Sequence, residues 1–219
     1  MLPLDESGSV GQPLILRRDI IVTVLEIVRG AWIYVCNRTD INTESDEPTI
    51  AGALYHEMWN EKQRRGILGP PQIVNEPASR ASNQSLKPDG FIDFKLLYGW
   101  GNEQDYFGIE CKCVSSSSKG KYERLAREYV TKGIKRFVKG IYIPGHDFAA
   151  MLGFVIEGNT EDSINRICEQ LKKRQTEILL EENWLEEDSF GKHPNLYRTR
   201  HSQTSHNSSI NLLHLFLSW

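Results

Sequence analysis

Two apolar segments, Phe91–Tyr98 and Tyr106–Val114, constrain the fold of this chain more than any other part of its sequence. The glycine-rich sequence between them favours an antiparallel return, which would make them neighbouring strands of one sheet. Because alternate side chains of a strand point to opposite faces, Glu110 and Lys112 would share one face while Cys111 lies on the other. We therefore expect a polar pair on one face of this sheet and a hydrophobic core against the other.

An acid accompanies this pair on the first segment. Asp93 stands between two apolar residues and would be held by the sheet, whereas Asp89 belongs to a Pro-Asp-Gly sequence typical of a turn. Two carboxylates and an ammonium on the wall of a sheet are costly unless something pairs them, and the usual partner is a divalent cation with a water molecule. The sequence therefore predicts a metal site at Asp93 and Glu110, beside Lys112.

This arrangement resembles the PD-(D/E)xK nuclease superfamily, whose core carries an acid on one strand and Glu-x-Lys on the next. The sequences at 129–140 and 150–155 also resemble the helix and the fourth strand of restriction-endonuclease-like proteins from bacterial defence systems. In all, the resemblance covers half of the chain. A Glu-x-Lys triplet is common by chance, but its place after an Asp-bearing strand and before a basic helix makes the combination more specific.

The resemblance implies a fold, a reaction and a metal. The fold would be of the α/β class, a three-layer α/β/α restriction-endonuclease-like core with a mixed central sheet. The reaction would be hydrolysis of phosphodiester bonds by a Mg²⁺-dependent endonuclease, with DNA as substrate and with Asp93, Glu110 and Lys112 as catalytic residues. Asp93, Glu110 and the carbonyl of Cys111 would hold Mg²⁺, or Mn²⁺ as the alternative, because hard oxygen ligands disfavour zinc. Lys112 would position the attacking water or stabilise the charge that builds on the phosphorus centre.

A helix predicted over Thr49–Arg65 precedes these strands, and the family usually takes one more acid from such a helix. Glu47 and Glu57 are the candidates in this sequence. Glu47 lies one turn before Ile50, the first residue of the apolar side of this helix, and would face the sheet. The alternatives are a stabilising role for Glu47 at the helix N-terminus and a surface ion pair of Glu57 with Arg64 or Lys62.

Basic residues gather just after the Glu-x-Lys triplet. The whole chain has a formal net charge of −3, but residues 112–140 hold nine basic and two acidic residues, a local net charge of 9 − 2 = +7. Phosphate contacts supply most of the sequence-independent affinity for nucleic acids. We therefore expect nucleic-acid binding by a set of basic residues on this segment: Lys119, Lys121, Arg124, Lys132 and Arg136. The alternative is an ordinary solvated helix face.

The remaining elements follow from hydrophobic periodicity. Residues 1–18 are expected to form a flexible N-terminus and residues 19–219 a single domain. Helices are predicted over Asp19–Val35, where helix and strand compete, and over Tyr122–Val138 and Thr160–Trp184. Strands are predicted over Gln72–Glu76, Ala149–Glu157, Leu196–His201 and Ile210–Leu217.

The four cysteines, at positions 36, 111, 113 and 168, lack the spacing of a zinc site or a disulfide framework, which favours a reducing cytoplasm. The apolar runs are broken by charges, so no membrane association is expected. The histidines at 201, 206 and 214 are expected to be structural or to lie on the surface. For Arg198 and Arg200, phosphate binding is the functional alternative to a structural role.

A nuclease of this size would act with other defence-system subunits or as a homo-oligomer. One competing hypothesis is an inactive nuclease-fold subunit that binds nucleic acid or a partner protein. Another treats the two acids and the lysine as a structural ion-pair network in an unrelated binding domain. The residues themselves, apart from the resemblance, do not distinguish DNA from RNA or endonuclease from exonuclease action.

Overall fold

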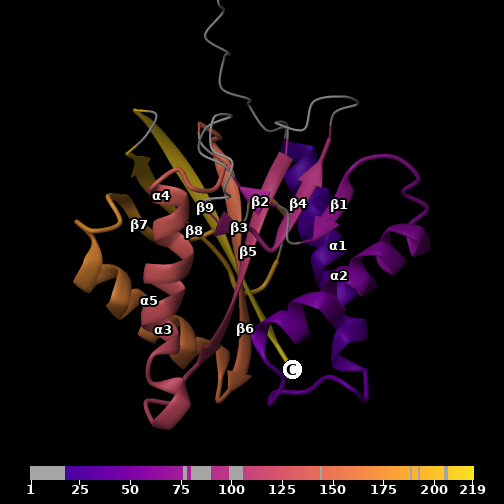
Figure 1. The fold of residues 1–219 in the computed structure, drawn as a ribbon, viewed down its shortest axis with the longest axis horizontal. Coiled ribbons are helices and arrows are strands. Elements are labelled where there is room, and N and C mark those ends of the chain that lie inside the picture. The colour runs from indigo at the N-terminus through magenta and orange to yellow at the C-terminus, as the bar shows by residue number, and fades with distance from the viewer. Residues whose placement is uncertain are drawn as a thin grey trace, which may run out of the picture.

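A seven-stranded mixed sheet forms the centre of the molecule (Figure 1). The computed structural model describes residues 18–75, 78–79, 90–98, 106–143, 145–187, 189–191, 193–204 and 207–219. Residues 1–17, Glu76, Asp89 and His206, on which some expectations fall, lie outside these ranges. In spatial order the strands are β1 (Gln72–Asn75), β4 (Phe94–Leu97), β5 (Tyr106–Ser115), β6 (Phe148–Glu157), β9 (Ser208–Ser218), β8 (Leu196–Gln203) and β7 (Leu180–Glu186).

The central strands of this sheet run parallel, and the outer ones are antiparallel to their neighbours. β6 pairs in parallel with both β5 and β9, whereas β1, β4, β7 and β8 join through antiparallel pairs. A separate two-stranded sheet consists of β2 (Ala78–Ser79) and β3 (Gly90–Phe91). The predicted antiparallel return from the first apolar segment to the second is confirmed by the pairing of β4 with β5.

Helices flank the sheet, and two hydrophobic clusters fill the space between helices and strands (Figure 1). The helical segments are α1 (Arg18–Cys36), α2 (Glu47–Arg64), η1 (Gly120–Tyr122), α3 (Leu125–Glu128), η2 (Tyr129–Ile134), α4 (Lys135–Val138) and α5 (Thr160–Arg174). Side chains of α1 and α2 join one cluster, and those of the α3–η2–α4 segment and α5 join the other. The chain is therefore a mixed α/β protein with helices packed against a mixed sheet.

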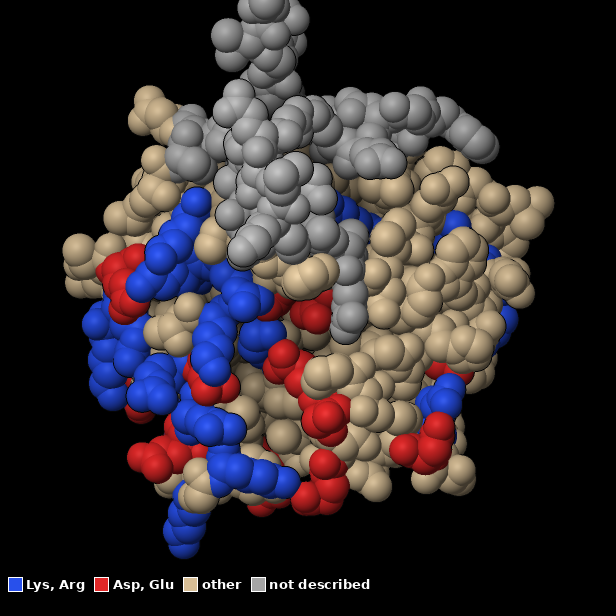
Figure 2. Space-filling view, viewed as in Figure 1, with Lys and Arg blue, Asp and Glu red and all other residues tan. Residues whose placement is uncertain are grey.

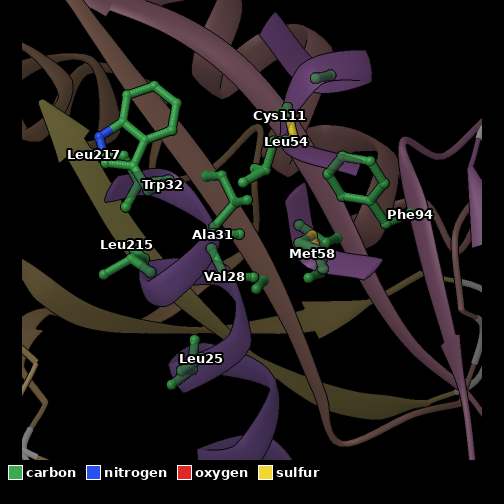
Figure 3. Close-up of a cluster of buried hydrophobic side chains, with 14 of the residues drawn as sticks. Leu25, Val28, Ala31, Trp32, Leu54, Met58, Phe94, Cys111, Leu215 and Leu217 are labelled. Atoms are coloured by element: carbon green, nitrogen blue, oxygen red, sulfur yellow. The ribbon is translucent and has the colours of Figure 1, made fainter. Parts of the chain in front are cut away.

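Buried side chains recur every three or four residues along α1, which decides the competition between helix and strand in favour of a helix. Leu25, Val28 and Trp32 of α1 pack beside Leu54 and Met58 of α2 in the first cluster (Figure 3). A repeat of 3.6 residues places such positions on one side of a helix. Within the described residues, no helix is both long and apolar enough to cross a membrane.

The start of α2 is fixed by a side-chain cap. The carboxylate of Asp46 accepts a hydrogen bond from the backbone amide of Thr49 at 3.0 Å, and proline lies in the first turn. This cap satisfies one of the amides that a helix N-terminus leaves without a partner. It also determines that Glu47 lies in the first helical turn, close to the sheet.

The sequence prediction was wrong at two boundaries. Asp93 lies in a break between β3 and β4, not inside a strand, because the chain passes there from the small sheet to the large one. The helix predicted to reach Trp184 ends at Arg174. Ile178 is buried, but it lies in a turn, and Leu179 adopts a positive φ of 46° before β7 begins.

The helix predicted over Tyr122–Val138 is present as the consecutive segments α3, η2 and α4, of which η2 is a π-helix. A π-turn inside a helix is uncommon and often lies at a functional site. Here η2 crosses the sheet at Gly133, where an added Cβ would lie 2.4 Å from Cε of Met151 and 3.6 Å from Cγ of Lys112. The close approach of η2 to the sheet therefore depends on glycine at position 133, which has no side chain.

A chain of buried polar groups crosses the second cluster and confirms the structural reading of two histidines. Nδ1 of His201 is 2.8 Å from the carbonyl oxygen of Ile178, so it must donate, and Nε2 then accepts from Thr199. The Thr199 hydroxyl in turn accepts from Nε2 of His214 at 2.8 Å, and Nδ1 of His214 accepts from Tyr129 at 3.0 Å. One carbonyl thus determines the tautomers of both rings.

Candidate active site at the open edge of β5

The site forms where β5 loses its neighbour on one side. β4 pairs with β5 only as far as Ile109, whereas β6 continues along the opposite edge. Beyond that point the amide of Cys111 donates to Oδ2 of Asp93 at 2.5 Å, and the amide of Cys113 donates to Oε2 of Glu47 at 3.0 Å. Two carboxylates therefore take the hydrogen bonds that a neighbouring strand would otherwise take.

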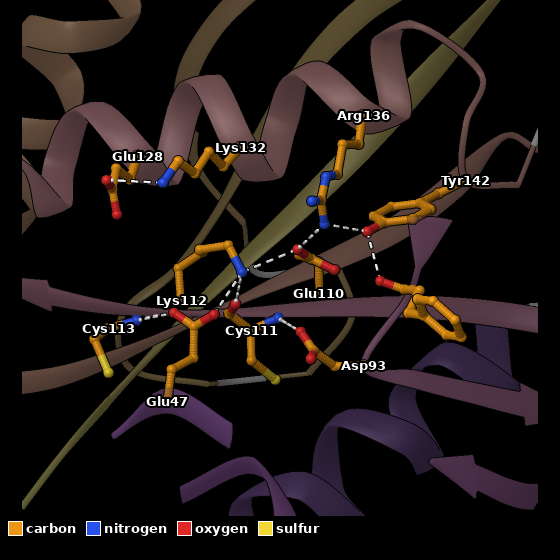
Figure 4. A network of polar contacts seen from close by, with 11 residues as sticks. Glu47, Asp93, Glu110, Cys111, Lys112, Cys113, Glu128, Lys132, Arg136 and Tyr142 are labelled. Carbon is orange, nitrogen blue, oxygen red and sulfur yellow. Dashed lines mark hydrogen bonds and ion pairs between the residues drawn. The ribbon is translucent and has the colours of Figure 1, made fainter. Parts of the chain in front are cut away.

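The side chains of Glu110 and Lys112 lie side by side on one face of β5 (Figure 4). Glu110 is only 1 % exposed. Nζ of Lys112 lies 2.9 Å from Oε1 of Glu110, 2.7 Å from Oε1 of Glu47 and 2.6 Å from the carbonyl oxygen of Cys111. Three oxygen atoms thus surround the ammonium, as the ligands of a bound cation would.

A second cation, Arg136 of α4, contacts the carboxylate of Glu110. Nη1 of Arg136, on α4, lies 3.2 Å from Oε1 of Glu110 and also donates to the hydroxyl of Tyr142 (Figure 4). Tyr142 in turn donates to the carbonyl oxygen of Phe91 at 2.6 Å. Both cations contact Oε1, while Oε2 of Glu110 is buried without a hydrogen-bond partner in the described part of the chain.

The pKa values of Glu110 and Lys112 are both raised, but for different reasons. Burial raises the pKa of Glu110 to about 7, although Lys112 acts against this shift. For Lys112, burial alone would lower the pKa, but the charges of Glu110, Glu47 and Asp93 together outweigh it and raise the pKa above its ordinary value. Lys112 is therefore an ammonium at neutral pH, and Glu110 is poised between its two forms.

The predicted candidates separate clearly in the structure. Asp93, Glu110, Lys112 and the Cys111 backbone come together at the open edge, and Glu47 joins them through Lys112. Glu57 does not reach the site: its carboxylate lies 3.6 Å from Arg38 and 3.7 Å from Arg64, so the expected pairing with Arg64 is present.

Tyr142 was missed by the sequence analysis, and Arg136 was assigned only to nucleic-acid binding. Tyr142 lies in an irregular stretch after α4, where neither periodicity nor a motif marks it. Its contacts join residues that are 6 and 51 positions away in the chain, which no local pattern encodes. The basic character of the segment gave the only signal for Arg136.

Basic residues form a row along the helical segment beside the acidic site. Figure 2 shows this blue row next to a group of red acidic side chains. Lys119 is exposed, Lys121 pairs with Glu44 at 2.8 Å, and Lys132 pairs with Glu128 at 2.9 Å. These exposed pairs are weak and are readily exchanged for phosphate.

Arg124 belongs to the same row and lies 3.6 Å from Glu128 on the neighbouring turn. Arg198 and Arg200, by contrast, are paired within the β7–β8 region: Arg198 lies 2.9 Å from Glu187, and Arg200 lies 3.0 Å from Glu181. These pairs support a structural role for both arginines.

The donor atoms at the open edge fit a hard divalent cation. No three histidine, cysteine, aspartate or glutamate side chains within the described ranges are grouped closely enough to hold a metal alone. Mg²⁺, however, commonly uses one or two carboxylates and completes its shell with water and substrate oxygens. Asp93, the Cys111 carbonyl and the unpartnered Oε2 of Glu110 supply oxygens of this kind. An ion that used the carbonyl would compete with Lys112.

Comparisons with known proteins assign no family to this chain. No family model, no curated protein and no solved structure matches the chain.

Proposed function

We propose that this protein is a metal-dependent nuclease that hydrolyses phosphodiester bonds, with DNA as its substrate. The observation that carries the proposal is the convergence of Asp93, Glu110, Lys112 and Glu47 on the open edge of β5. Carboxylates that can hold a divalent cation, beside an ammonium that can stabilise negative charge, are the groups that this reaction needs.

The architecture supports a restriction-endonuclease-like core as the fold. The Asp93 segment enters β4, β4 pairs with the Glu-x-Lys strand β5, and a basic helical segment leads from β5 to the parallel strand β6. This order of acid, Glu-x-Lys strand, basic helix and buried strand is the order on which the resemblance rests.

The residues at the open edge have distinct roles in the proposed mechanism. Asp93, Glu110 and the carbonyl of Cys111 would hold Mg²⁺, with Mn²⁺ as the alternative. When bound there, the ion would supply Lewis-acid chemistry for the scissile phosphate and for a water molecule. Lys112 keeps its proton, because its neighbours raise its pKa, and it stabilises the charge that develops on the phosphate. Glu47 holds that ammonium in place from α2.

The basic row would position the nucleic-acid backbone alongside this site. Its exposed members are Lys119, Lys121, Arg124 and Lys132, and Arg136 links the row to Glu110. Phosphate contacts of this kind give affinity without sequence preference. The resemblance further supports a role as the effector of a bacterial defence system, with other subunits or a second copy of the chain as partners.

The test is cleavage of labelled plasmid, linear duplex, single-stranded DNA and RNA with Mg²⁺, Mn²⁺ or EDTA. Wild type is compared with Lys112→Ala and Asp93→Ala. Lys62→Ala is the matched control, because Lys62 is also a buried lysine, bonded to the carbonyls of Gly69 and Pro71 away from the site. We expect metal-dependent cutting that both site variants lose by at least about a hundredfold and that the control retains.

One observation favours a second candidate, a nuclease-like fold that binds nucleic acid or a partner protein without cutting. The ammonium of Lys112 already contacts Oε1 of Glu110 and the carbonyl of Cys111, so these groups form a self-contained ion-pair network. This candidate predicts nucleic-acid or partner binding without metal-dependent cutting, and for Lys112→Ala a lower melting temperature as the main effect. Absence of cutting on every substrate, in folded wild type with either metal, would contradict the nuclease.

A further inference from the structure

Tyr142 lies between the two halves of the candidate site. Its hydroxyl bonds to the carbonyl of Phe91, two residues before Asp93, and to the guanidinium of Arg136, which contacts Glu110 (Figure 4). Asp93 and Glu110 come from separate segments of the chain. Tyr142 is thus a single group that contacts both the segment carrying one acid and the cation beside the other.

The Tyr142 hydroxyl uses its only proton in one of these hydrogen bonds. A carbonyl can only accept, so the single proton of the phenol points to Phe91 and the oxygen accepts from Arg136. Burial raises the pKa of Tyr142, which keeps the proton in place at neutral pH. Phenylalanine at this position would remove both bonds and keep the ring.

Close packing holds the ring of Tyr142 in place. Tyr142 is fully buried, and its ring packs edge-on against Phe137 with centroids 5.3 Å apart. An added Cβ at Gly90 would lie 3.2 Å from Cε1 of Tyr142, so the backbone beside Phe91 approaches the ring closely. This packing holds the hydroxyl oxygen of Tyr142 at a fixed place between the Phe91 segment and Arg136.

We infer that Tyr142 is a positioning residue that holds the Asp93 segment and Arg136 in register with Glu110, and so sets the distance between the two acids. This inference rests on the proposed function, because the spacing matters only if the acids bind one ion. Replacing a group that orients metal ligands without touching the metal typically weakens metal binding by about 10- to 100-fold.

The experiment measures Mn²⁺ affinity of the full-length protein by calorimetry, without nucleic acid. Tyr142→Phe is compared with wild type, with Arg136→Gln and with the double variant. Tyr129→Phe is the matched control, since it also removes a buried hydroxyl on the face of the sheet that the α3–η2–α4 segment covers. The Tyr129 hydroxyl bonds to His214. Melting temperatures record the stability of each variant.

We expect Tyr142→Phe to weaken Mn²⁺ binding by about 10- to 100-fold. The double variant should bind Mn²⁺ no more weakly than whichever single variant has the lower affinity, because both substitutions break the same connection. Tyr129→Phe should keep wild-type affinity even if its melting temperature falls further. A residue with only a structural role would change affinity in step with melting temperature, in both tyrosine variants alike.

Three outcomes decide the matter separately. Wild-type protein that binds no Mn²⁺ overturns the proposed function itself. Wild-type binding with unchanged affinity in Tyr142→Phe overturns the role of Tyr142 and leaves the nuclease proposal standing. Losses that multiply in the double variant overturn the link through Arg136.

Discussion

The ammonium of Lys112 lies 2.9 Å from Oε1 of Glu110, while the second oxygen of that carboxylate is buried without a hydrogen-bond partner in the described part of the chain. Arg136 also contacts Oε1, so the two cations leave Oε2 uncompensated when Glu110 ionises. An incompletely compensated buried carboxylate favours its neutral form. The protonation of Glu110 is therefore coupled to the stability of the fold.

Stability of the metal-free protein should fall as the pH rises from 4.5 to about 7, as far as Glu110 contributes. Its pKa is raised from an ordinary value of 4.5 to about 7, so the folded protein keeps a proton that the unfolded chain has already lost. At about 1.4 kcal/mol per pH unit, the full effect is about 3 kcal/mol. Urea unfolding across this range should show a smaller loss of stability in Glu110→Gln than in wild type.

The difference between wild type and variant isolates this effect from the histidines, which act in the opposite direction. Burial lowers the pKa of His201 to about 4, so its contribution to stability is present above pH 6.5 and is lost as the pH falls toward 4. Glu57→Gln serves as the control carboxylate. Identical pH profiles of wild type and Glu110→Gln would contradict the prediction.

Two helical glycines should respond to alanine in opposite ways. At Gly133 the new methyl group would lie 2.4 Å from Cε of Met151, the end of a flexible but fully buried side chain, so Met151 must shift and the protein should be destabilised by about 1 kcal/mol. At Gly52 of α2 no atom lies within 4 Å of the added methyl group, so Gly52→Ala should stabilise it by up to about 1 kcal/mol. Thermal and urea unfolding measure both changes. Equal effects at the two positions would show that the close approach of η2 to the sheet is not a packing constraint.

Thr199→Val should disrupt the buried chain of polar groups. The hydroxyl accepts from His214 and donates to His201, so its loss leaves one buried donor and one buried acceptor without partners. Each costs about 1–3 kcal/mol, and we expect a loss of about 2–5 kcal/mol in the free energy of unfolding.

Thr131→Val is the control for that substitution, because the Thr131 hydroxyl bonds only to the carbonyl of Arg127 on an exposed helix surface. Its unfolding free energy should change by less than about 0.5 kcal/mol. A Thr199→Val protein as stable as the control would mean that the two rings find other partners.

Nucleic-acid binding should depend on salt through the basic row. Each phosphate contact adds about one unit to the slope of log affinity against log salt concentration, so Lys132→Gln should reduce the slope by about one. Arg29→Gln removes one positive charge from α1, on the opposite side of the sheet, and should leave the slope unchanged. Fluorescence anisotropy in the presence of EDTA, which prevents cutting, measures both slopes. Equal slopes for the two variants would place the bound nucleic acid elsewhere.

The sequence predicts those parts of the molecule that depend on local periodicity. Alternation placed Glu110 and Lys112 on one face of a strand, and the 3.6-residue repeat predicted α2 within two residues of its ends. The bounds of α1 were predicted within one residue, although helix and strand competed there. The same reasoning failed at Ile178, whose spacing from Leu171 continues the helical pattern although the chain has already turned. Burial of a side chain does not distinguish a helix from a turn that folds back onto the same core.

The site itself depends on contacts between distant segments, and these were predicted less completely. Glu47 and Lys112 are 65 residues apart, and their contact requires the first turn of α2 to lie at the open edge of β5. The resemblance directed attention to Glu47 but also to Glu57, because both stand on the same helix. Only the packing of that helix distinguishes them. No local pattern predicts that the pairing of β4 with β5 ends at Ile109 of β5 and leaves the edge beyond it open.

That open edge has a consequence for the solution behaviour of the protein. Unpaired amides along an exposed strand are a template on which a strand of another molecule can add, the first step toward aggregation. At β5 the amides of Cys111 and Cys113 are already engaged by the carboxylates of Asp93 and Glu47, and negative charge at the edge repels an approaching backbone carbonyl. The two acids therefore also protect this edge against strand addition, so replacing both should lower the solubility of the protein.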